Sequence, residues 1–362
     1  MRDFLKVVVL AMMASLALGV GATARAVMYF SPDSQDVTAV AWSPDGRYIL
    51  SSGFEGTIRL WRADACEAGP FLYIDDPRLR LREVENGDGP RLAGVMSVAW
   101  SPDGRHFAAG LRDRTVRLFE IDPETQNSEV FHEIEVFSHE NMGGLRSVAF
   151  SPDSSLVASA GHDYSIRIWE AKKHGSMVAE LKGHEWMVES ITFSSNGSTL
   201  LSGSYDGTVR VWDISTKQEN QRFFARGQVT SVALSPDNRL AVSLAYPIHQ
   251  NDFAISVWNT AAGEKVREFG FNTLGTLLTQ LAFSPDGIHL ASGNLEPGII
   301  RIWNVETGKS EHELSIPYGV VRGISYSKNG RYIVAGIVFG APIIWNAETG
   351  QIVRMLGKCT QH

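Results

Sequence analysis

Apolar and polar residues alternate along short stretches of this chain, and the same stretch returns at intervals of 41 to 58 residues. One copy reads VTAVAWSPDG at 37–46, and another reads VTSVALSPDN at 229–238. Proline presets φ and Gly or Asn accepts positive φ, so each copy predicts a strand that ends in a tight turn. The turn begins at one serine in each copy: Ser43, Ser101, Ser151, Ser194, Ser235, Ser284 and Ser327.

Two more strands follow each turn. The first is rich in small residues, as in LVASAG or TLLSGS, and the next alternates toward an aromatic residue, as in TVRVW. Five of the seven aromatics stand 18 residues after their serine, a constancy that two separate β-sandwiches would not require. These aromatics are Trp61, Phe119, Trp169, Trp212, Trp258, Trp303 and Trp345. A fourth strand fits weaker stretches such as 176–184 and 263–271.

Four short antiparallel strands repeated radially make a propeller blade, and stacking blades around an axis buries faces that one sheet would expose. Small residues let neighbouring blades approach, and the aromatic fills the wider gap further out. The sequence therefore predicts an all-β fold, a single seven-bladed β-propeller over 27–362. Its blade cores are expected near 37–62, 95–120, 145–170, 188–213, 229–259, 278–304 and 320–346.

The outer strand of the seventh blade has two candidates, 351–356 and 27–30, which cannot both pair at once. The C-terminal segment is favoured, because cleavage of a signal peptide near Ala26 would leave the other segment as a frayed terminus.

The N-terminus has the three-part pattern of a secretory signal. Arg2 and Lys6 precede an apolar run at 7–20, and small residues with two A-x-A sites follow at 22–26. The run is short for a membrane span. We expect residues 1–26 to direct export, to the periplasm or outside the cell. The alternative is an intracellular protein whose uncleaved N-terminus packs on the domain.

We call the face that carries the loops between second and third strands, and between blades, the top face. Cys66 follows a third strand, at the bottom, whereas Cys359 follows a fourth strand, near the top. A disulfide needs Cα atoms within about 7 Å, so no Cys66–Cys359 bond is expected unless the C-terminus folds back.

Two insertions interrupt the repeat, within 63–94 and at 244–253. In the first, the RLRLR alternation from Arg78 is either an outer strand with arginines facing water, or a loop that follows an outer strand FLYID at 71–75. The second lengthens a top loop, where binding tends to occur.

Composition and motifs bring little chemistry to this picture. The net charge of −7 argues against a phosphate-binding surface, so no nucleic acid is expected. The chain lacks GxSxG, GxGxxG, GxxxxGK[ST], HExxH and CxxC motifs. We therefore expect no catalytic residues, no metal site and no cofactor, and no membrane span after signal removal.

The strongest copy, with Gly183-His184 and SGSYDGTVRVWD, resembles the WD-repeat β-propeller family. The resemblance covers 27–357, and the SPDG turns are also similar to periplasmic propellers of the Tol system, as in bacterial-type exported WD-repeat proteins. It implies one hydrogen-bonded network in each of two copies, made by His184, Ser202, Asp206 and Trp212, and by His139, Ser159, Asp163 and Trp169. Elsewhere the turn acid persists as Asp113, Asp252 and Glu55 and is replaced by Gly340, so packing is expected to hold those blades.

The top face is the expected place of function, because its loops display aromatic residues and arginine, which are enriched in binding hot spots. These candidates are Phe54, Arg112, Tyr164, Trp186, Tyr205, Tyr246 and Phe339. We expect an exported, non-catalytic scaffold that binds a protein or peptide partner there. The alternatives are a propeller hydrolase or lyase that uses channel-mouth carboxylates or a metal, and an intracellular WD-repeat scaffold.

Overall fold

The structure is a computed structural model. It describes residues 37–64, 72–74, 81–82, 91–92, 94–121, 131–139, 143–246, 253–271, 278–294, 298–316, 319–338 and 340–356. The chain divides into two units, 1–34 and 35–362. The first unit lies outside the described residues, and so do the predicted signal and the segment 27–30.

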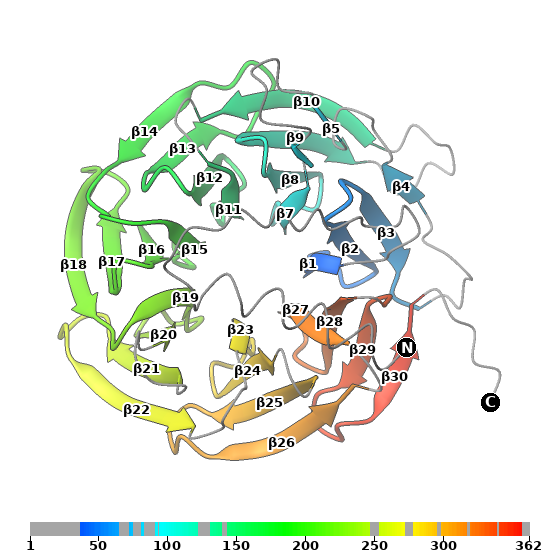
Figure 1. Cartoon of the computed structure of the whole chain (residues 1–362), viewed down its shortest axis with the longest axis vertical. Coiled ribbons are helices and arrows are strands. Elements are labelled where there is room, and N and C mark those ends of the chain that lie inside the picture. Colours follow the sequence, from blue (N-terminus) through cyan, green and yellow to red (C-terminus); the bar gives the residue numbers. More distant parts are fainter. Residues whose placement is uncertain are drawn as a thin grey trace, which may run out of the picture. The chain divides into compact units, whose positions relative to one another are not determined.

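Seven four-stranded antiparallel sheets follow one another around an axis, which confirms the predicted all-β, seven-bladed propeller (Figure 1). In each blade the first strand lies innermost and the fourth outermost (Figure 1).

The strands of blades one to three are β1 (Val37–Trp42), β2 (Tyr48–Gly53), β3 (Ile58–Arg62), β4 (Leu72–Ile74), β7 (Val95–Trp100), β8 (His106–Leu111), β9 (Thr115–Ile121), β10 (Phe131–Ser138), β11 (Leu145–Phe150), β12 (Leu156–Gly161), β13 (Ile166–Glu170) and β14 (Met177–Leu181).

Those of blades four to seven are β15 (Val188–Phe193), β16 (Thr199–Ser204), β17 (Thr208–Asp213), β18 (Gln218–Phe224), β19 (Gln228–Leu234), β20 (Leu240–Tyr246), β21 (Phe253–Asn259), β22 (Lys265–Phe271), β23 (Leu278–Phe283), β24 (His289–Asn294), β25 (Ile299–Asn304), β26 (Ser310–Ser315), β27 (Val320–Tyr326), β28 (Tyr332–Val338), β29 (Ile343–Asn346) and β30 (Ile352–Met355).

Small residues of the second strands allow the close packing of neighbouring blades. A Cβ added at Gly203 would lie 2.6 Å from side-chain atoms of both Val229 and Val232, on the first strand of the next blade. Further out, the terminal aromatics fill the space; Phe107 and Phe119 stack with their ring centroids 4.7 Å apart. The gradient from small to large side chains is the one that the repeat predicts.

The ring closes by packing between blades seven and one rather than by exchange of a described strand. The C-terminal strand β30 pairs with β29, which confirms the favoured candidate for the outer strand of blade seven. Val37 and Val40 of blade one share a core cluster with Val334 and Ile344 of blade seven. Arg354 adds a hydrogen bond from Nη1 to the carbonyl oxygen of Ala63, at 2.7 Å.

The insertion after blade one differs from one of its two predicted forms. β4 pairs with β3, so the FLYID segment supplies the outer strand and the RLRLR segment does not. Instead β5 (Leu81–Arg82) pairs with β6 (Arg91–Leu92) in a separate two-stranded sheet.

The second insertion is shorter than the sequence suggests, since its ends extend the strands β20 and β21. Residues 247–252 between them lie outside the described part of the chain, as do Cys66, Cys359 and Asp252. In the described part, no helix is long and apolar enough to cross a membrane.

Candidate functional site on the top face

A chain of four side chains runs from a top loop of blade four into its interior. Trp212 Nε1 donates to Ser202 Oγ at 2.8 Å, and an indole N–H can only donate. The Ser202 hydroxyl therefore gives its hydrogen to His184 Nε2, at 2.7 Å. This leaves Nδ1–H of His184 to donate to Asp206 Oδ2, at 2.8 Å, so the hydrogen bonds assign the tautomer.

The charges of this network are settled by burial and hydrogen bonding together. Burial lowers the pKa of His184, and Asp206 only partly opposes the shift. Burial alone would raise the pKa of Asp206, but hydrogen bonds from His184 and Thr208 hold that pKa well below its ordinary value. A neutral imidazole thus bridges a hydroxyl and an ionised carboxylate.

Blade three repeats the arrangement with the second predicted set of residues. His139 lies 2.9 Å from Asp163 and 2.8 Å from Ser159, and Trp169 Nε1 donates to Ser159 at 2.9 Å. In three other blades the described residues form the tryptophan–serine half of the network, which the sequence analysis missed. These pairs are Trp61–Ser51 at 2.7 Å, Trp258–Ser243 at 3.0 Å and Trp303–Ser292 at 2.9 Å.

Buried arginines of the third strands join the top turns to the outer strands. Arg210 is 1% exposed; its Nη1 donates to Glu219 on β18 at 2.8 Å, and its Nη2 lies 3.4 Å from Asp206. Arg167 with Asp163 and Glu180, Arg117 with Asp113 and Glu133, and Arg59 with Glu55 repeat all or part of this pattern. The turn acid therefore persists in blades without the histidine, because it also holds an arginine. The sequence feature that could have predicted these ion pairs is the arginine two residues before the aromatic.

Serines on the innermost strands link successive blades. Ser147 Oγ on β11 accepts a hydrogen bond from the backbone N–H of Ile191 on β15, at 3.2 Å. Equivalent bonds join Ser97 to Val148, Ser190 to Val232, Ser231 to Leu281 and, through a glutamine, Gln280 to Ile324. Ala39 and Gly323 stand at this position in the two remaining blades and cannot make the bond. The serine in LRSVAF or VESITF is the sequence feature that could have predicted these hydrogen bonds between blades.

Two predicted aromatics of blade four meet on the top face. Trp186, in the loop between β14 and β15, is 43% exposed, and its ring meets that of Tyr205 edge-on at 6.2 Å. Backbone contacts join their loops, since Tyr205 N–H donates to the carbonyl of Met187 at 2.9 Å and Ser204 Oγ donates to that of Trp186 at 3.0 Å. Tyr164, on the neighbouring blade three, is also 43% exposed.

A titratable group that the sequence did not single out lies beside this pair. Arg146 Nε on β11 is 3.2 Å from Glu189 on β15, and it donates to His162 Nε2 at 2.9 Å. Burial raises the pKa of Glu189, and burial together with Arg146 lowers that of His162. Burial and the nearby Glu189 charge also raise the pKa of Tyr205. The Arg146–Glu189 pair thus joins blades three and four beside Tyr205.

The structure places the other predicted residues elsewhere. Arg112 lies over the ring of Phe54 at 5.1 Å, between blades two and one. Tyr246 is partly buried; it packs edge-on against Phe253 at 6.5 Å and against the core between blades five and six. Phe339 lies outside the described residues. Within the described ranges, no group of three or more His, Cys, Asp or Glu side chains could hold a metal ion.

A family model described as "WD domain, G-beta repeat" matches residues 26–62, 87–120, 132–170, 175–213 and 263–304, more than half of the 362 residues. The match omits the copy with the lengthened 244–253 connection and the copy that has Gly340 in its turn.

Three relatives show how far the similarity reaches. The chain is 27% identical over 132 residues to "WD repeat-containing protein SL1-17" of Schistosoma mansoni (36% of this chain, 41% of that one). It is 31% identical over 86 residues to "WD repeat-containing protein 26 homolog" of Arabidopsis thaliana (24% and 12%). It is 26% identical over 99 residues to "Polyadenylation factor subunit 2" of Aspergillus fumigatus (25% and 19%). The matches span less than half of each relative's length, and all three relatives are eukaryotic.

Proposed function

Because this chain belongs to the WD-repeat family of β-propellers, we propose that it is a scaffold that binds a protein or peptide partner through the top face of blades three and four. The observation that carries this proposal is the exposed Trp186, whose ring meets that of Tyr205 edge-on, while the charges of Glu189 and Arg146 act on Tyr205. Exposed aromatics beside arginine are typical of binding hot spots.

The buried networks hold these side chains in place before a partner arrives. His184 stands two residues before Trp186, and Asp206 directly follows Tyr205. Asp206 also accepts a hydrogen bond from the backbone N–H of Glu185 at 3.0 Å, so one network restrains both aromatic loops. In blade three, Asp163 stands between His162 and Tyr164. A surface ordered in advance loses little conformational entropy on binding, which favours affinity.

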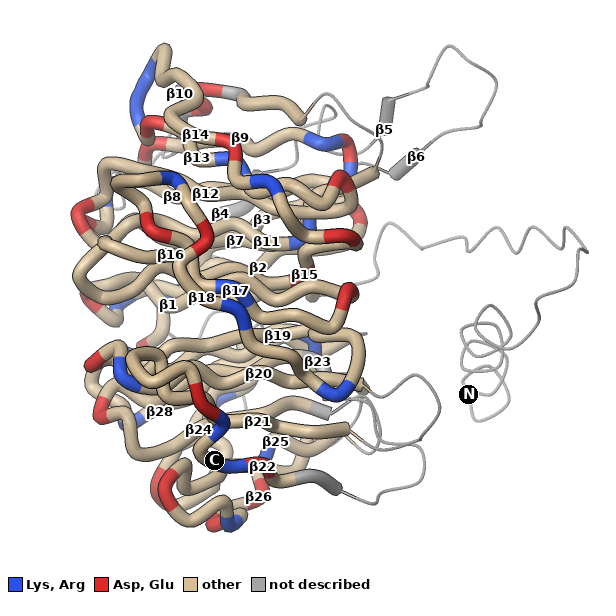
Figure 2. The backbone as a smooth tube through the Cα atoms, turned by 90° about the vertical axis from the view of Figure 1, so that its left-hand side faces the viewer, with Lys and Arg blue, Asp and Glu red and all other residues tan. Residues whose placement is uncertain are grey.

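The relatives support a partner-binding role in general terms. The fungal relative is, by its name, a subunit of a polyadenylation factor and hence part of an assembly. Figure 2 shows both acidic and basic positions along the described backbone of the propeller. The net charge of −7 favours a protein partner over a nucleic acid.

The test compares capture of partners from native extract by the wild type and by the double variant Trp186→Ala, Tyr205→Ala. The matched control is Ile288→Ala, because Ile288 is 51% exposed but lies in the turn between β23 and β24, on the bottom face of blade six. We expect proteins recovered by the wild type and the control to be lost by the double variant. Unchanged recovery by a folded double variant would reject the top-face assignment.

The proposed role is non-catalytic. The chain carries none of the nucleophile, phosphate-loop or zinc motifs sought above, and the top-face groups Glu189 and His162 are both engaged with Arg146. A panel of ester, phosphoester and glycoside substrates should show no turnover that scales with the amount of purified protein. Turnover lost in Glu189→Gln would establish an enzyme instead.

We also propose that residues 1–26 direct export, on the strength of the basic start, the apolar run at 7–20 and the A-x-A sites. N-terminal sequencing of the native protein should find Val27 or a neighbouring residue as the first. A mature chain that begins at Met1 in the cytosolic fraction would support an intracellular scaffold.

A further inference from the structure

The turns between first and second strands form a ring on the bottom face, opposite to the proposed binding surface. In most junctions the residue after the turn serine touches the next blade's turn. A Cβ added at Gly197 would lie 3.2 Å from Pro152, and one at Gly287 would lie 3.2 Å from Pro236. The pairs Pro44–Gly104 and Pro285–Gly330 are in similar contact, at 4.0 and 3.6 Å.

Two junctions replace this contact by a hydrogen bond. The backbone N–H of Asp103 donates to Ser154 Oγ at 3.1 Å, and Asn238 Nδ2 donates to Ser195 Oγ at 2.7 Å. Six of the seven junctions are therefore joined at this level.

The junction between blades seven and one is the exception. Lys328 stands where five other copies have a proline, and no atom lies within 4 Å of a Cβ added at Gly46. A lysine side chain is long and extends away from its turn, so it leaves uncovered the space that a proline ring would close.

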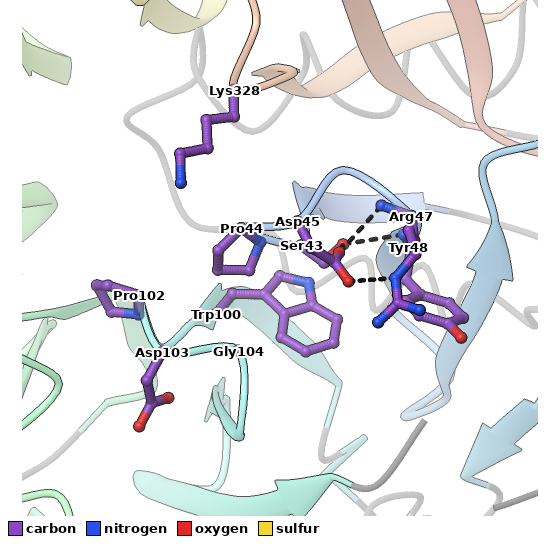
Figure 3. A pocket seen from close by; sticks show the side chains of 10 residues that line it. All are labelled: Ser43, Pro44, Asp45, Arg47, Tyr48, Trp100, Pro102, Asp103, Gly104 and Lys328. Atoms are coloured by element: carbon purple, nitrogen blue, oxygen red, sulfur yellow. Dashed lines mark hydrogen bonds and ion pairs between the residues drawn. The ribbon is translucent and has the colours of Figure 1, made fainter. Parts of the chain in front are cut away.

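A pocket of about 330 Å³ lies beside this gap, a volume at the lower end of the range for small-ligand sites. Pro44, Pro102 and the buried Trp100 supply apolar lining, and Lys328 lies across from them (Figure 3). Trp100 is 8% exposed, and its indole N–H has no hydrogen-bond acceptor among the described residues.

The pocket is lined by two carboxylates and two cationic side chains. Asp45 is paired with Arg47, at 2.6 Å, and also accepts from Ser43. The Asp103 carboxylate points away from Lys328 in Figure 3 and accepts hydrogen bonds from Ser101 and the Arg105 backbone. Lys328 has no ion pair or hydrogen bond with any described residue. Lys328 is therefore the cation that remains for a ligand carboxylate, beside an apolar wall.

We propose that this bottom pocket binds a peptide carboxylate that is adjacent to an apolar side chain. Lys328 pairs with the carboxylate, and the apolar side chain packs on Pro44, Pro102 and Trp100. A C-terminal carboxylate and an Asp or Glu side chain both supply this chemistry. The site is independent of the top-face surface, so either assignment can fail without the other.

The test uses the full chain and three short probes in calorimetric titrations. Acetyl-Gly-Leu carries a terminal carboxylate, acetyl-Leu-Glu-amide carries a side-chain carboxylate, and acetyl-Gly-Leu-amide carries neither. We expect at least one carboxylate probe to bind about tenfold more tightly than the uncharged probe, as one charge-assisted contact allows. The carboxylate probe that binds more tightly shows whether the pocket prefers a terminal or a side-chain carboxylate. Equal binding of all three probes, or no binding, would overturn the proposal.

Two variants of Lys328 assign the effect to the pocket. Lys328→Gln removes the charge and should weaken the carboxylate probe about tenfold. Lys328→Pro restores the residue of the other turns and should abolish binding by closing the gap over Gly46. The matched control, Lys309→Gln, removes an exposed bottom-face lysine of blade six and should bind as the wild type does. Wild-type affinity in Lys328→Gln would also overturn the proposal, and a cooperative thermal unfolding transition in each variant shows that it is folded.

Discussion

Blades four and seven have the same four strands but hold them together differently. In blade four, Trp212 is bonded to Ser202, His184 and Asp206 in turn, and Arg210 joins that network to the outer strand. In blade seven, Ala335 stands in place of the serine and Ile343 in place of the arginine. Trp345 is fully buried there among Ile333, Ile337 and Ile343.

The difference shows that the polar network is not needed to make a blade. Packing of apolar residues is sufficient in blade seven, since burial of a large side chain contributes about 1.5–3 kcal/mol without any hydrogen bond. The network is present where loops must be positioned, beneath Trp186 and Tyr205. Its presence in blades three and four therefore coincides with the proposed binding surface.

The largest expected effect comes from removing either tryptophan. Trp212→Ala and Trp345→Ala should each lower the free energy of unfolding by about 3–5 kcal/mol, because both leave a large cavity. The phenylalanine variants distinguish the two blades by their loss of stability. Trp212→Phe also leaves Ser202 without its donor and should cost about 1–3 kcal/mol more than Trp345→Phe. Urea unfolding measures both; equal losses in the two phenylalanine variants would show that the network adds no stability.

The next effect concerns the turn acids of blades four and two. Asp206→Asn weakens the bond to His184 and leaves Arg210 with Glu219 as its remaining carboxylate. The free energy of unfolding should fall by about 1–3 kcal/mol, as for a buried charge-assisted bond. Asp113→Asn should cost less, because Asp113 lies 3.8 Å from Arg117 and has no histidine partner in the described structure. Thermal unfolding of both variants decides; a greater loss in Asp113→Asn would contradict this ranking.

A smaller effect is expected for the bonds between innermost strands. Ser147→Ala removes the hydrogen bond to Ile191 and should cost about 0.5–1.5 kcal/mol. Hydrogen exchange of the Ile191 amide should accelerate, toward the rate of Trp42, whose amide is 3.4 Å from Ser325 at the closing junction. We expect the junction between blades seven and one to be weaker than the junction between blades three and four. Slower exchange at Trp42 than at Ile191 in the wild type would contradict this expectation.

The smallest expected effect is a pH dependence that arises in blade four. The pKa of His184 is lowered by burial, so the unfolded chain binds the proton more tightly than the folded one. The stability of the neutral form is complete above the unfolded value of about 6.5 and is lost as the pH falls below it. His162 adds in the same sense, whereas Glu189, with its raised pKa, acts in the opposite sense at lower pH.

His184→Gln should therefore flatten the fall in melting temperature between about pH 7 and about pH 5. His289→Gln serves as the control, because this histidine is partly exposed and pairs with Glu311 on the bottom side. An unchanged slope in His184→Gln would show that the pKa of His184 does not differ between the folded and the unfolded chain.

Much of the fold could be predicted from the sequence because the residues that specify each blade lie close together in the chain. The turn serine, the small-residue strand and the aromatic at a constant spacing lie within one copy, and the residues of the blade-four network lie within 28 positions of one another. The top-face surface was only partly foreseen. The rings of Trp186 and Tyr205 are in contact on adjacent loops. Tyr246 instead packs against Phe253 of its own blade.

The contacts between blades could not be read in this way. Arg146 and Glu189 occupy the same position in consecutive copies, and only the stacking of β11 beside β15 brings them within 3.2 Å. The bonds from Ser147 to Ile191 and its equivalents depend on the same stacking. The bottom pocket depends on the meeting of the first and last blades, far apart in the chain.

The repeated pattern of residues is therefore sufficient to specify seven similar sheets and the networks inside them, because periodicity and turn chemistry act over a few tens of residues. The pattern does not say which side chains of different copies face each other. The packed ring decides that, since contacts such as Lys328 beside the turn of Pro44 exist only after the blades have closed. Both proposed binding surfaces lie at such contacts, one between blades three and four and one where the ring closes.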